Sequence, residues 1–237
     1  MERFWGRSSP GIRELGEDVW RGNLAPDLNG IEVLGVPLGT PEYVTAQLRA
    51  TLADHQTLLQ RLVKVPETQR AWLIFSLSAV PRANHLLRTI NPDLVPEFAR
   101  EHGSNLQNTL RRLLGHGDVG EGVDRQLRAF FLPVAMGGLG MRSAERTSTA
   151  AYWASWADVL SVLRARAPTT AAEILEDLQR EGGPRAACLQ AAQAAKARLE
   201  AEAQQAAPSW ESCARGARPD SEACPFMAEP GEWKHGW

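Results

Sequence analysis

The stretch TPEYVTAQLRATLADHQTLLQRL, residues 40–62, carries the clearest periodic pattern in this 237-residue chain. Thr40 is suited to cap a helix, Pro41 to its first position and Glu42 to the positive end of its dipole. Apolar side chains then recur every three or four residues, with one histidine among them. The pattern therefore predicts an α-helix with one buried face and with His55 at its edge: Val44, Leu48, Leu52, His55, Leu59 and Leu62.

Comparable stripes continue along the chain as far as residue 166. Pro66 is expected to start the next helix, which carries Trp72 and Phe75, and Pro81 to end or kink it. Since each stripe gives its helix a face to bury, we expect a compact helical domain from about residue 40 to 166. The later stripes are Leu106, Leu110, Leu113 and Leu114; Val123, Leu127, Phe130 and Phe131; and Trp153, Trp156, Leu160 and Leu163.

Strand signals are confined to the segment before this helical region. Residues 1–30 are rich in glycine and proline without a sustained period, and Asn29-Gly30 is a turn signal. Residues 31–39 are short, β-branched and punctuated by glycine, which is typical of a strand or hairpin. The predicted fold class is therefore mainly α: a helical bundle preceded by one short β-hairpin or strand, with flexible termini.

The composition changes after residue 166. Residues 171–179 are expected to form a short helix that Gly182-Gly183-Pro184 breaks. Residues 184–207 contain 11 alanines, which favour a helix but offer little bulk, so we expect it to be exposed or loosely docked. Beyond Pro208 we expect disorder, with exposed Trp210, Trp233 and Trp237. The predicted organisation is an irregular segment at 1–30, a helical domain with its hairpin at 31–166, an Ala-rich helical extension at 167–207 and a disordered tail at 208–237.

Composition excludes several classes of protein. With 43% hydrophobic and 23% charged residues, the chain is of ordinary globular composition. Its longest mostly apolar stretch, Ala71 to Val80, is ten residues, whereas a membrane-spanning helix needs about twenty. We see no secretion signal, and three widely spaced cysteines do not make a disulfide scaffold. We expect an intracellular protein, nuclear or cytoplasmic, with no membrane partner.

Charge is unevenly distributed. Residues 43–166 hold fifteen Lys and Arg against ten Asp and Glu, whereas the rest of the chain is acidic. A basic surface of this kind can track phosphates without reading base sequence. Ordinary surface arginines, some paired with acids, are an equally good explanation. The candidate nucleic-acid-binding residues are Arg82, Arg88, Arg111, Arg112, Arg125, Arg128 and Arg142.

Motifs for other chemistry are weak. Residues 115–120 match G-x-G-x-x-G, but the preceding stretch is helical and no acid follows at the distance a dinucleotide fold requires. Cys213, Cys224 and His235 are spaced too widely for a zinc module. The histidines are scattered and accompany no nucleophile or metal motif. We therefore expect no catalytic residue, metal, cofactor or small-molecule substrate.

The order of several segments resembles the region downstream of the active site in reverse transcriptases of non-LTR retrotransposons. The likeness covers roughly residues 31–163, and the run Leu-Pro, three residues, then Gly-Gly-Leu-Gly is its most specific part. The segments that carry it are Val33–Gly39, Trp72, Pro81–Arg88, Leu132–Ala144 and Ala150–Trp156.

The resemblance implies where these segments would lie in the polymerase fold and which partner they would bind. Leu34, Gly35 and Gly39 would belong to the palm exit near the primer grip, and the helices after Pro41 to a thumb and connector that hold an RNA or RNA–DNA duplex. Ala135 stands where the family often has a basic residue. The chain has no Asp-Asp pair, whereas such polymerases hold two metal ions with palm aspartates. We therefore expect a truncated, reverse-transcriptase-like polypeptide without polymerase activity alone. The missing fingers and palm, met in trans, are a candidate partner.

Two other hypotheses stay open. The chain can be a helical protein-interaction domain or a non-functional retroelement remnant, since it lacks catalytic groups. An enzyme with an unrecognised site ranks lowest, because no cluster of acid, base and nucleophile supports it.

Overall fold

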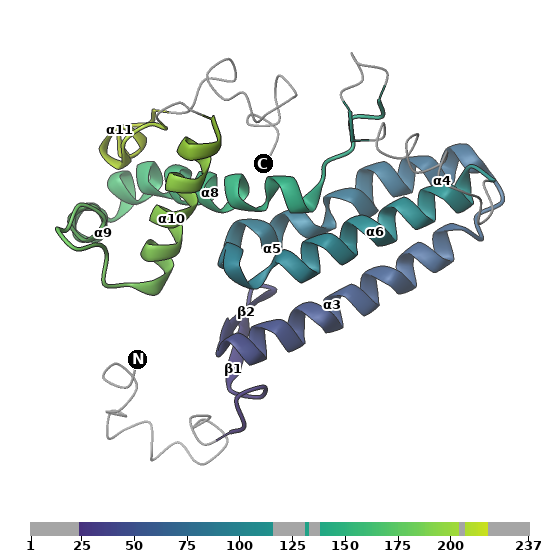
Figure 1. Cartoon of the computed structure of the whole chain (residues 1–237), viewed down its shortest axis with the longest axis horizontal. Coiled ribbons are helices and arrows are strands. Elements are labelled where there is room, and N and C mark those ends of the chain that lie inside the picture. Colours follow the sequence, from purple (N-terminus) through teal and green to yellow (C-terminus); the bar gives the residue numbers. More distant parts are fainter. Residues whose placement is uncertain (1–23, 116–130, 133–137, 204–206, 218–237) are drawn as a thin grey trace. The chain divides into compact units, whose positions relative to one another are not determined.

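The computed structural model describes residues 24–115, 131–132, 138–203 and 207–217. It is mainly helical, with one antiparallel hairpin before the helices, which confirms the predicted fold class. The expected flexible ends, residues 1–23 and 218–237, lie outside the described residues. The elements (Figure 1) are β1 (Gly30–Val33), β2 (Val36–Gly39), α3 (Pro41–Leu62), α4 (Thr68–Ile74), the π-helix η1 (Phe75–Ala79), the 3₁₀ helices η2 (Val80–Ala83) and η3 (Pro92–Leu94), α5 (Asn84–Thr89), α6 (Pro96–Leu113), α8 (Ala144–Arg166), α9 (Pro168–Leu178), α10 (Ala187–Ala203) and α11 (Trp210–Ala214).

The chain divides into two compact units, Met1–Thr51 and Leu52–Trp237. This division differs from the expected limits at residues 30 and 166, which rested on composition. It falls inside α3 because the last turns of that helix pack with later helices: Leu59 and Leu62 share a buried cluster with Phe75 and Leu106. No break follows Arg166, because α9, α10 and α11 all pack on α8.

In the first unit, β1 and β2 pair antiparallel, from Gly30 opposite Gly39 to Val33 opposite Val36. Leu34 and Gly35 form the turn with φ angles of 52° and 79°. Two positive φ angles are typical of the type I′ turn, whose twist matches that of the paired strands. The turn of the hairpin therefore lies at Leu34-Gly35, and a separate turn at residues 26–28 precedes β1 near the Asn29-Gly30 signal.

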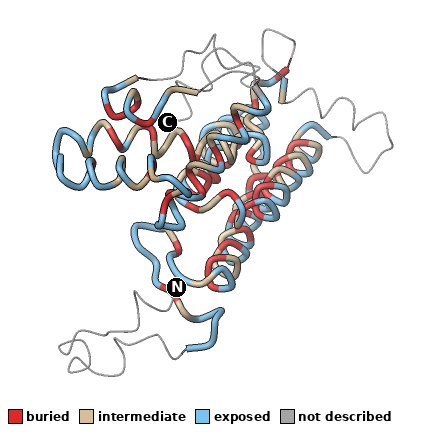
Figure 2. Tube along the Cα trace, turned by 60° about the vertical axis from the view of Figure 1, so that its left-hand side comes forward, coloured by how far each residue is buried: buried red, intermediate tan, exposed pale blue. Residues whose placement is uncertain are grey.

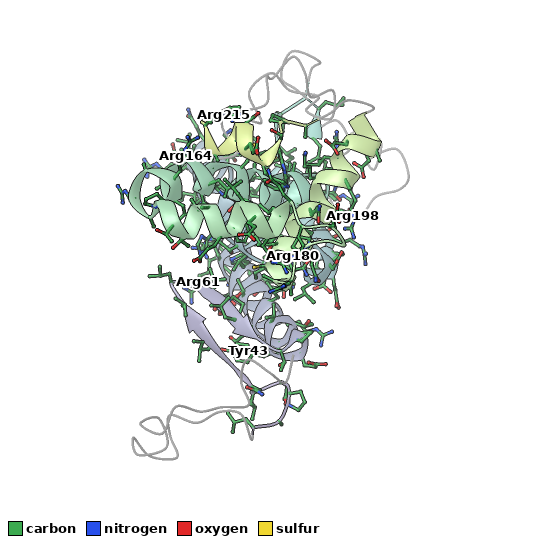
Figure 3. The ribbon with its side chains drawn as sticks, turned by 90° about the vertical axis from the view of Figure 1, so that its left-hand side faces the viewer. Tyr43, Arg61, Arg164, Arg180, Arg198 and Arg215 are labelled. Atoms are coloured by element: carbon green, nitrogen blue, oxygen red, sulfur yellow. The ribbon has the colours of Figure 1, made fainter. Side chains whose placement is uncertain are left out.

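The hairpin packs closely on the first turn of α3. A Cβ added to Gly30 would lie 2.1 Å from Cδ1 of Tyr43, so only glycine lets this ring approach the strand. Figure 3 shows Tyr43 beside the hairpin. Thr40 caps α3 as predicted: its Oγ1 accepts a 3.3 Å hydrogen bond from the Tyr43 N–H and also bonds to the Pro26 carbonyl.

One buried cluster of the second unit joins the end of α3 to α4, η1 and α6. In Figure 2 buried residues recur along the helices, with exposed residues between them. As predicted, the stripe of α6 is buried at Leu106 and Leu110, while Leu114 is 46% exposed because α6 has already ended. The cluster comprises Leu59, Leu62, Ala71, Phe75, Ala79, Leu106, Leu110 and Met141.

Pro81 changes the helix type around it. The helix that starts at Thr68 widens to a π-helical turn at Phe75–Ala79 and tightens to 3₁₀ at Val80–Ala83 before α5 begins. Proline has no N–H for a helical bond and its ring crowds the carbonyl four residues earlier, so the chain leaves α geometry without leaving its helical path. The prediction that Pro81 ends or kinks the helix is therefore met by a change of helix type, since α geometry stops at Ile74 and resumes at Asn84.

A second cluster surrounds one end of α8 (Figure 1), where α9, α10 and α11 pack. The Tyr152 hydroxyl donates a 3.2 Å hydrogen bond to the Cys188 carbonyl, and Ala192 and Ala195 are buried. The Ala-rich segment is thus docked and not loose, because small side chains let α10 approach α8 closely.

The expected disorder from Pro208 does not extend over residues 208–217. Ser209 caps α11 by accepting a 3.2 Å hydrogen bond from the Ser212 N–H, and Trp210 is buried, not exposed. Packing of the indole on α8 supplies apolar burial that composition alone did not indicate. The predicted break between α9 and α10 is confirmed, with positive φ at Gly182 and Gly183. Trp233 and Trp237 lie outside the described residues.

Candidate nucleic-acid interface

The candidate arginines lie in several different environments. Arg82 and Arg112 are exposed, Arg88, Arg111 and Arg142 are half-buried, and Arg125 and Arg128 lie outside the described residues. Within the described part of the chain, neither Arg82 nor Arg112 forms an ion pair. These two side chains are the most available for a phosphate.

Arg88 has a different environment. It lies on α5, which packs along α8, and Asp158 of α8 attracts it electrostatically. Burial lowers the pKa of Arg88 below its usual value, while Asp158 raises it. The carboxylate compensates a half-buried guanidinium, so this arginine contributes more to helix packing than to an open phosphate surface.

Arg111, Arg112 and Arg142 come from two segments that the fold brings together. Arg111 and Arg112 occupy the last turn of α6 directly after Leu110, and Arg142 follows Met141. Met141 belongs to the same buried cluster as Leu110, so the two segments border one hydrophobic core. Basic residues in the last turn of a helix also stabilise it through the helix dipole, which gives Arg111 and Arg112 a structural role.

The palm-exit candidates lie in the first unit. Leu34 and Gly35 are the hairpin turn, and Leu34 is 91% exposed. Gly39 ends β2 where a Cβ would lie 2.4 Å from the Asn29 carbonyl oxygen. Both glycines are therefore explained by backbone geometry, whatever else the hairpin does.

The basic excess is concentrated in one part of the second unit. The described residues between 52 and 166 contain twelve Lys and Arg against seven Asp and Glu, whereas residues 167–217 contain five against seven. In the latter region Arg198 pairs with Asp93 at 2.8 Å and Arg180 with Asp177 at 3.3 Å. Figure 3 labels Arg180 and Arg198 among the side chains of this region. The net positive charge therefore belongs to the helices from the end of α3 to α8.

A histidine pair lies near Arg82 and was not recognised from sequence. His55 of α3 and His102 of α6 are 8% and 2% exposed, and their ring centroids are 5.5 Å apart, edge to face. Phe98 stacks on His102 with centroids 6.1 Å apart. The sequence did indicate that His102 lies on the buried face of its helix, because it continues the four-residue spacing of Phe98, Leu106 and Leu110. That this face meets the one carrying His55 is known only from the tertiary fold.

Both imidazoles are held in the neutral form. Burial is the main cause that lowers the pKa of His55 to about 4. A proton on His102 and the charge of Arg82 also lower it, and Asp54 raises it. Burial also lowers the pKa of His102, and a hydrogen bond to the Val80 carbonyl acts in the opposite direction. Neutral, packed imidazoles of this kind give no general acid or base open to a substrate.

The other candidate motifs gain no site within the described residues. Among them, no group of three or more His, Cys, Asp or Glu is arranged to hold a metal ion. Gly115, the first glycine of the G-x-G-x-x-G match, follows the helix α6 with φ 73°, as expected of a helix-ending loop, and the rest of the match is outside the described residues. Cys213 is buried in α11, and Cys224 and His235 are not described.

No helix in the described residues is long and apolar enough to cross a membrane. No protein-family model matches this chain, and neither a curated protein nor a solved structure matches it.

Proposed function

We propose that the helices from residue 52 to 166 bind RNA or RNA–DNA hybrid duplex through phosphate contacts that do not depend on base sequence. The observation that carries this proposal is the basic excess of these helices, with Arg82 and Arg112 exposed. Arginine binds phosphate through two parallel hydrogen bonds, and several such contacts supply sequence-independent affinity.

The resemblance to non-LTR reverse transcriptases supports the same proposal. A hairpin followed by helices is the order that a palm exit and thumb would have, and this chain has that order. In this proposal residues 31–166 derive from such a thumb and connector, act inside the cell, and meet fingers and palm only in trans. The sequence contains no adjacent aspartates, so the proposed role is holding a duplex and not polymerisation.

The test is fluorescence anisotropy of the full chain with a labelled RNA–DNA hybrid across a salt series. We expect a dissociation constant in the range of about 10⁻⁴ to 10⁻⁶ M with a steep salt dependence. Arg82→Gln with Arg112→Gln should weaken binding to unrelated hybrid sequences equally. Each lost phosphate contact should reduce the slope of log K against log salt by about 0.9.

A matched control is Arg70→Gln with Arg198→Gln, which removes the same charge from exposed arginines already paired with Glu67 and Asp93. This pair should change the slope less than the test pair. Absence of binding at low salt would refute the proposal, and so would equal effects of the two double variants.

An exposed apolar strip favours a second function, protein interaction. Leu73, Ile74 and Leu77 on α4 and η1 are 49%, 42% and 76% exposed, beside the fully buried Phe75. Neighbouring apolar groups of this size on a surface are typical of a contact site. If the strip mediates self-association, sedimentation of the chain should show a concentration-dependent mass that Leu73→Gln with Leu77→Gln abolishes.

A further inference from the structure

Two buried imidazoles lie against the irregular helical segment η1–η2. The His102 Nε2–H donates a 3.4 Å hydrogen bond to the carbonyl of Val80, the first residue of η2. His55 packs edge to face on His102, and its ring centroid lies 6.3 Å from that of Phe98. The pair therefore joins α3, α6 and η2 at one point.

A proton added at Nδ1 of either ring requires a change in the surroundings of that ring. The Nδ1 atoms of both histidines are buried and form no hydrogen bond within the described part of the chain. Donation from His102 Nε2 to Val80 leaves Nδ1 as the atom that a proton would occupy. A proton on a buried Nδ1 creates a charged donor without an acceptor, and burying such a group is strongly unfavourable.

The charged groups around the pair oppose a further positive charge. Arg82 of η2 and the second imidazole both disfavour protonation of His55, and Asp54 of α3 is the carboxylate that favours it. On His102, the Val80 carbonyl is the group that favours the charged ring. Among the groups that act on the pair, the carboxylate of Asp54 therefore has to offset the charge of Arg82 and of up to two imidazolium ions.

The segment that the pair contacts has the weakest helical geometry in its surroundings. It passes from α to π to 3₁₀ helix, and the 3₁₀ turn contains Pro81, so its hydrogen-bond pattern is less regular than that of a continuous α-helix. Local opening of such a segment costs less than unfolding the whole unit.

We propose that the His55–His102 pair is an acid-sensitive latch that holds the η1–η2 segment, Phe75–Ala83, against α3 and α6 while both rings are neutral and releases it when a ring is protonated. The released segment exposes both Nδ1 atoms to water, which provides the missing hydrogen-bond partner. Arg82 moves with η2, so the latch also controls the position of this exposed guanidinium. The inference does not depend on the proposed nucleic-acid binding.

The test is hydrogen–deuterium exchange of the full chain at pH 7 and pH 5, read by mass spectrometry and corrected for the intrinsic pH dependence of exchange. With the pKa of His55 moving from about 4 in the closed state to 6.5 in the open state, opening should rise about 20-fold between these pH values. Protection in peptides covering residues 75–83 should fall accordingly, and at both pH values it should stay well below that of residues 153–160 in α8, which exchange only when the whole unit unfolds.

Variants separate the latch from general acid sensitivity. His55→Leu extends the apolar stripe of α3, and His102→Gln keeps an N–H donor for the Val80 carbonyl. Each should reduce the pH response of residues 75–83, whereas His85→Gln, at an exposed histidine of α5, should retain it. Unchanged wild-type protection at pH 5 would overturn the proposal, and this readout needs no variant. Equal protection of residues 75–83 and of residues 153–160 at pH 5, or a full response in both latch variants, would overturn it as well.

Discussion

The indole rings of Trp153 and Trp210 lie 6.3 Å apart at a tilt of 52°, and they join α8 to the short helix α11. Trp153 is 1% exposed and Trp210 6% exposed, so both belong to the interior of the second unit. A residue from a segment rich in serine and proline therefore completes the core around α8. The last described helix is an integral part of this core.

Trp210→Ala should destabilise the second unit. Removing a buried indole usually costs about 3–5 kcal/mol, because transfer free energy is lost and a cavity remains. Urea unfolding followed by circular dichroism measures this loss. Glu202→Ala, an exposed position on α10, is the control and should change the free energy of unfolding by less than about 0.5 kcal/mol. A Trp210→Ala chain as stable as the control would show that α11 does not contribute to the core.

Leu34→Asn should stabilise the hairpin. Leu34 has φ 52° and is 91% exposed, so its side chain contributes little burial in exchange for an unfavourable backbone angle. Asparagine tolerates this angle better and precedes Gly35 in the preferred type I′ combination, which should gain about 0.5–1 kcal/mol. Slower hydrogen exchange in peptides covering residues 30–39 would report the gain.

The same substitution at Leu38 is the matched control. Leu38 lies in β2 opposite Ile31 and is 49% exposed, so asparagine there lowers strand propensity and weakens a cross-strand pair. Exchange should become faster. If both substitutions had the same sign, the turn geometry would not be what limits the hairpin.

Periodicity was sufficient to predict the elements with strong local signals. The stripe of α3 with its Thr40 cap, the stripe of α6 and the interruption of α geometry around Pro81 all follow from side-chain spacing and backbone chemistry. These features depend on neighbours within a few residues, which a single sequence displays directly.

Contacts between distant helices could not be read in this way. Alanine looks like a weak packing residue, yet Ala192 is fully buried because a small side chain permits close approach of α10. His55 and His102 looked scattered because their pairing depends on how α3 meets α6. From the sequence alone Arg88 resembled a surface cation, but in the structure α5 packs on α8, where Asp158 compensates its charge. The sequence therefore predicted which arginines could bind phosphate, but only the fold separates the exposed ones from those that pack between helices.

Stability should rise with pH between about 4 and 6.5. The pKa of His55 is lowered from 6.5 to about 4 in the folded chain, so in this range the unfolded chain binds more protons than the folded one. Folding is therefore penalised fully below pH 4 and not at all well above pH 6.5. At about 1.4 kcal/mol for each pKa unit, His55 alone can account for up to about 3 kcal/mol.

The contribution of His55 is isolated by comparing wild type with His55→Leu in urea unfolding at several pH values. The difference in free energy of unfolding between the two chains should shift in favour of the variant as pH falls from 7 to 4. A difference that stays constant over this range would mean that His55 titrates alike in the folded and unfolded chains.

Asp158→Ala should destabilise the packing of α5 on α8 because it leaves the half-buried Arg88 without its carboxylate. The expected cost is about 1–3 kcal/mol, which is typical for a charged group deprived of a partner. Arg88→Met removes the charge but keeps an apolar chain of similar length, so it should relieve much of this cost in the double variant. A double-mutant cycle in urea unfolding should give a coupling energy of about 1 kcal/mol, whereas strict additivity would separate the two residues. If the proposed phosphate contacts are made by Arg82 and Arg112, Arg88→Met should also leave the salt dependence of hybrid binding unchanged, since Arg88 is half-buried beside Asp158.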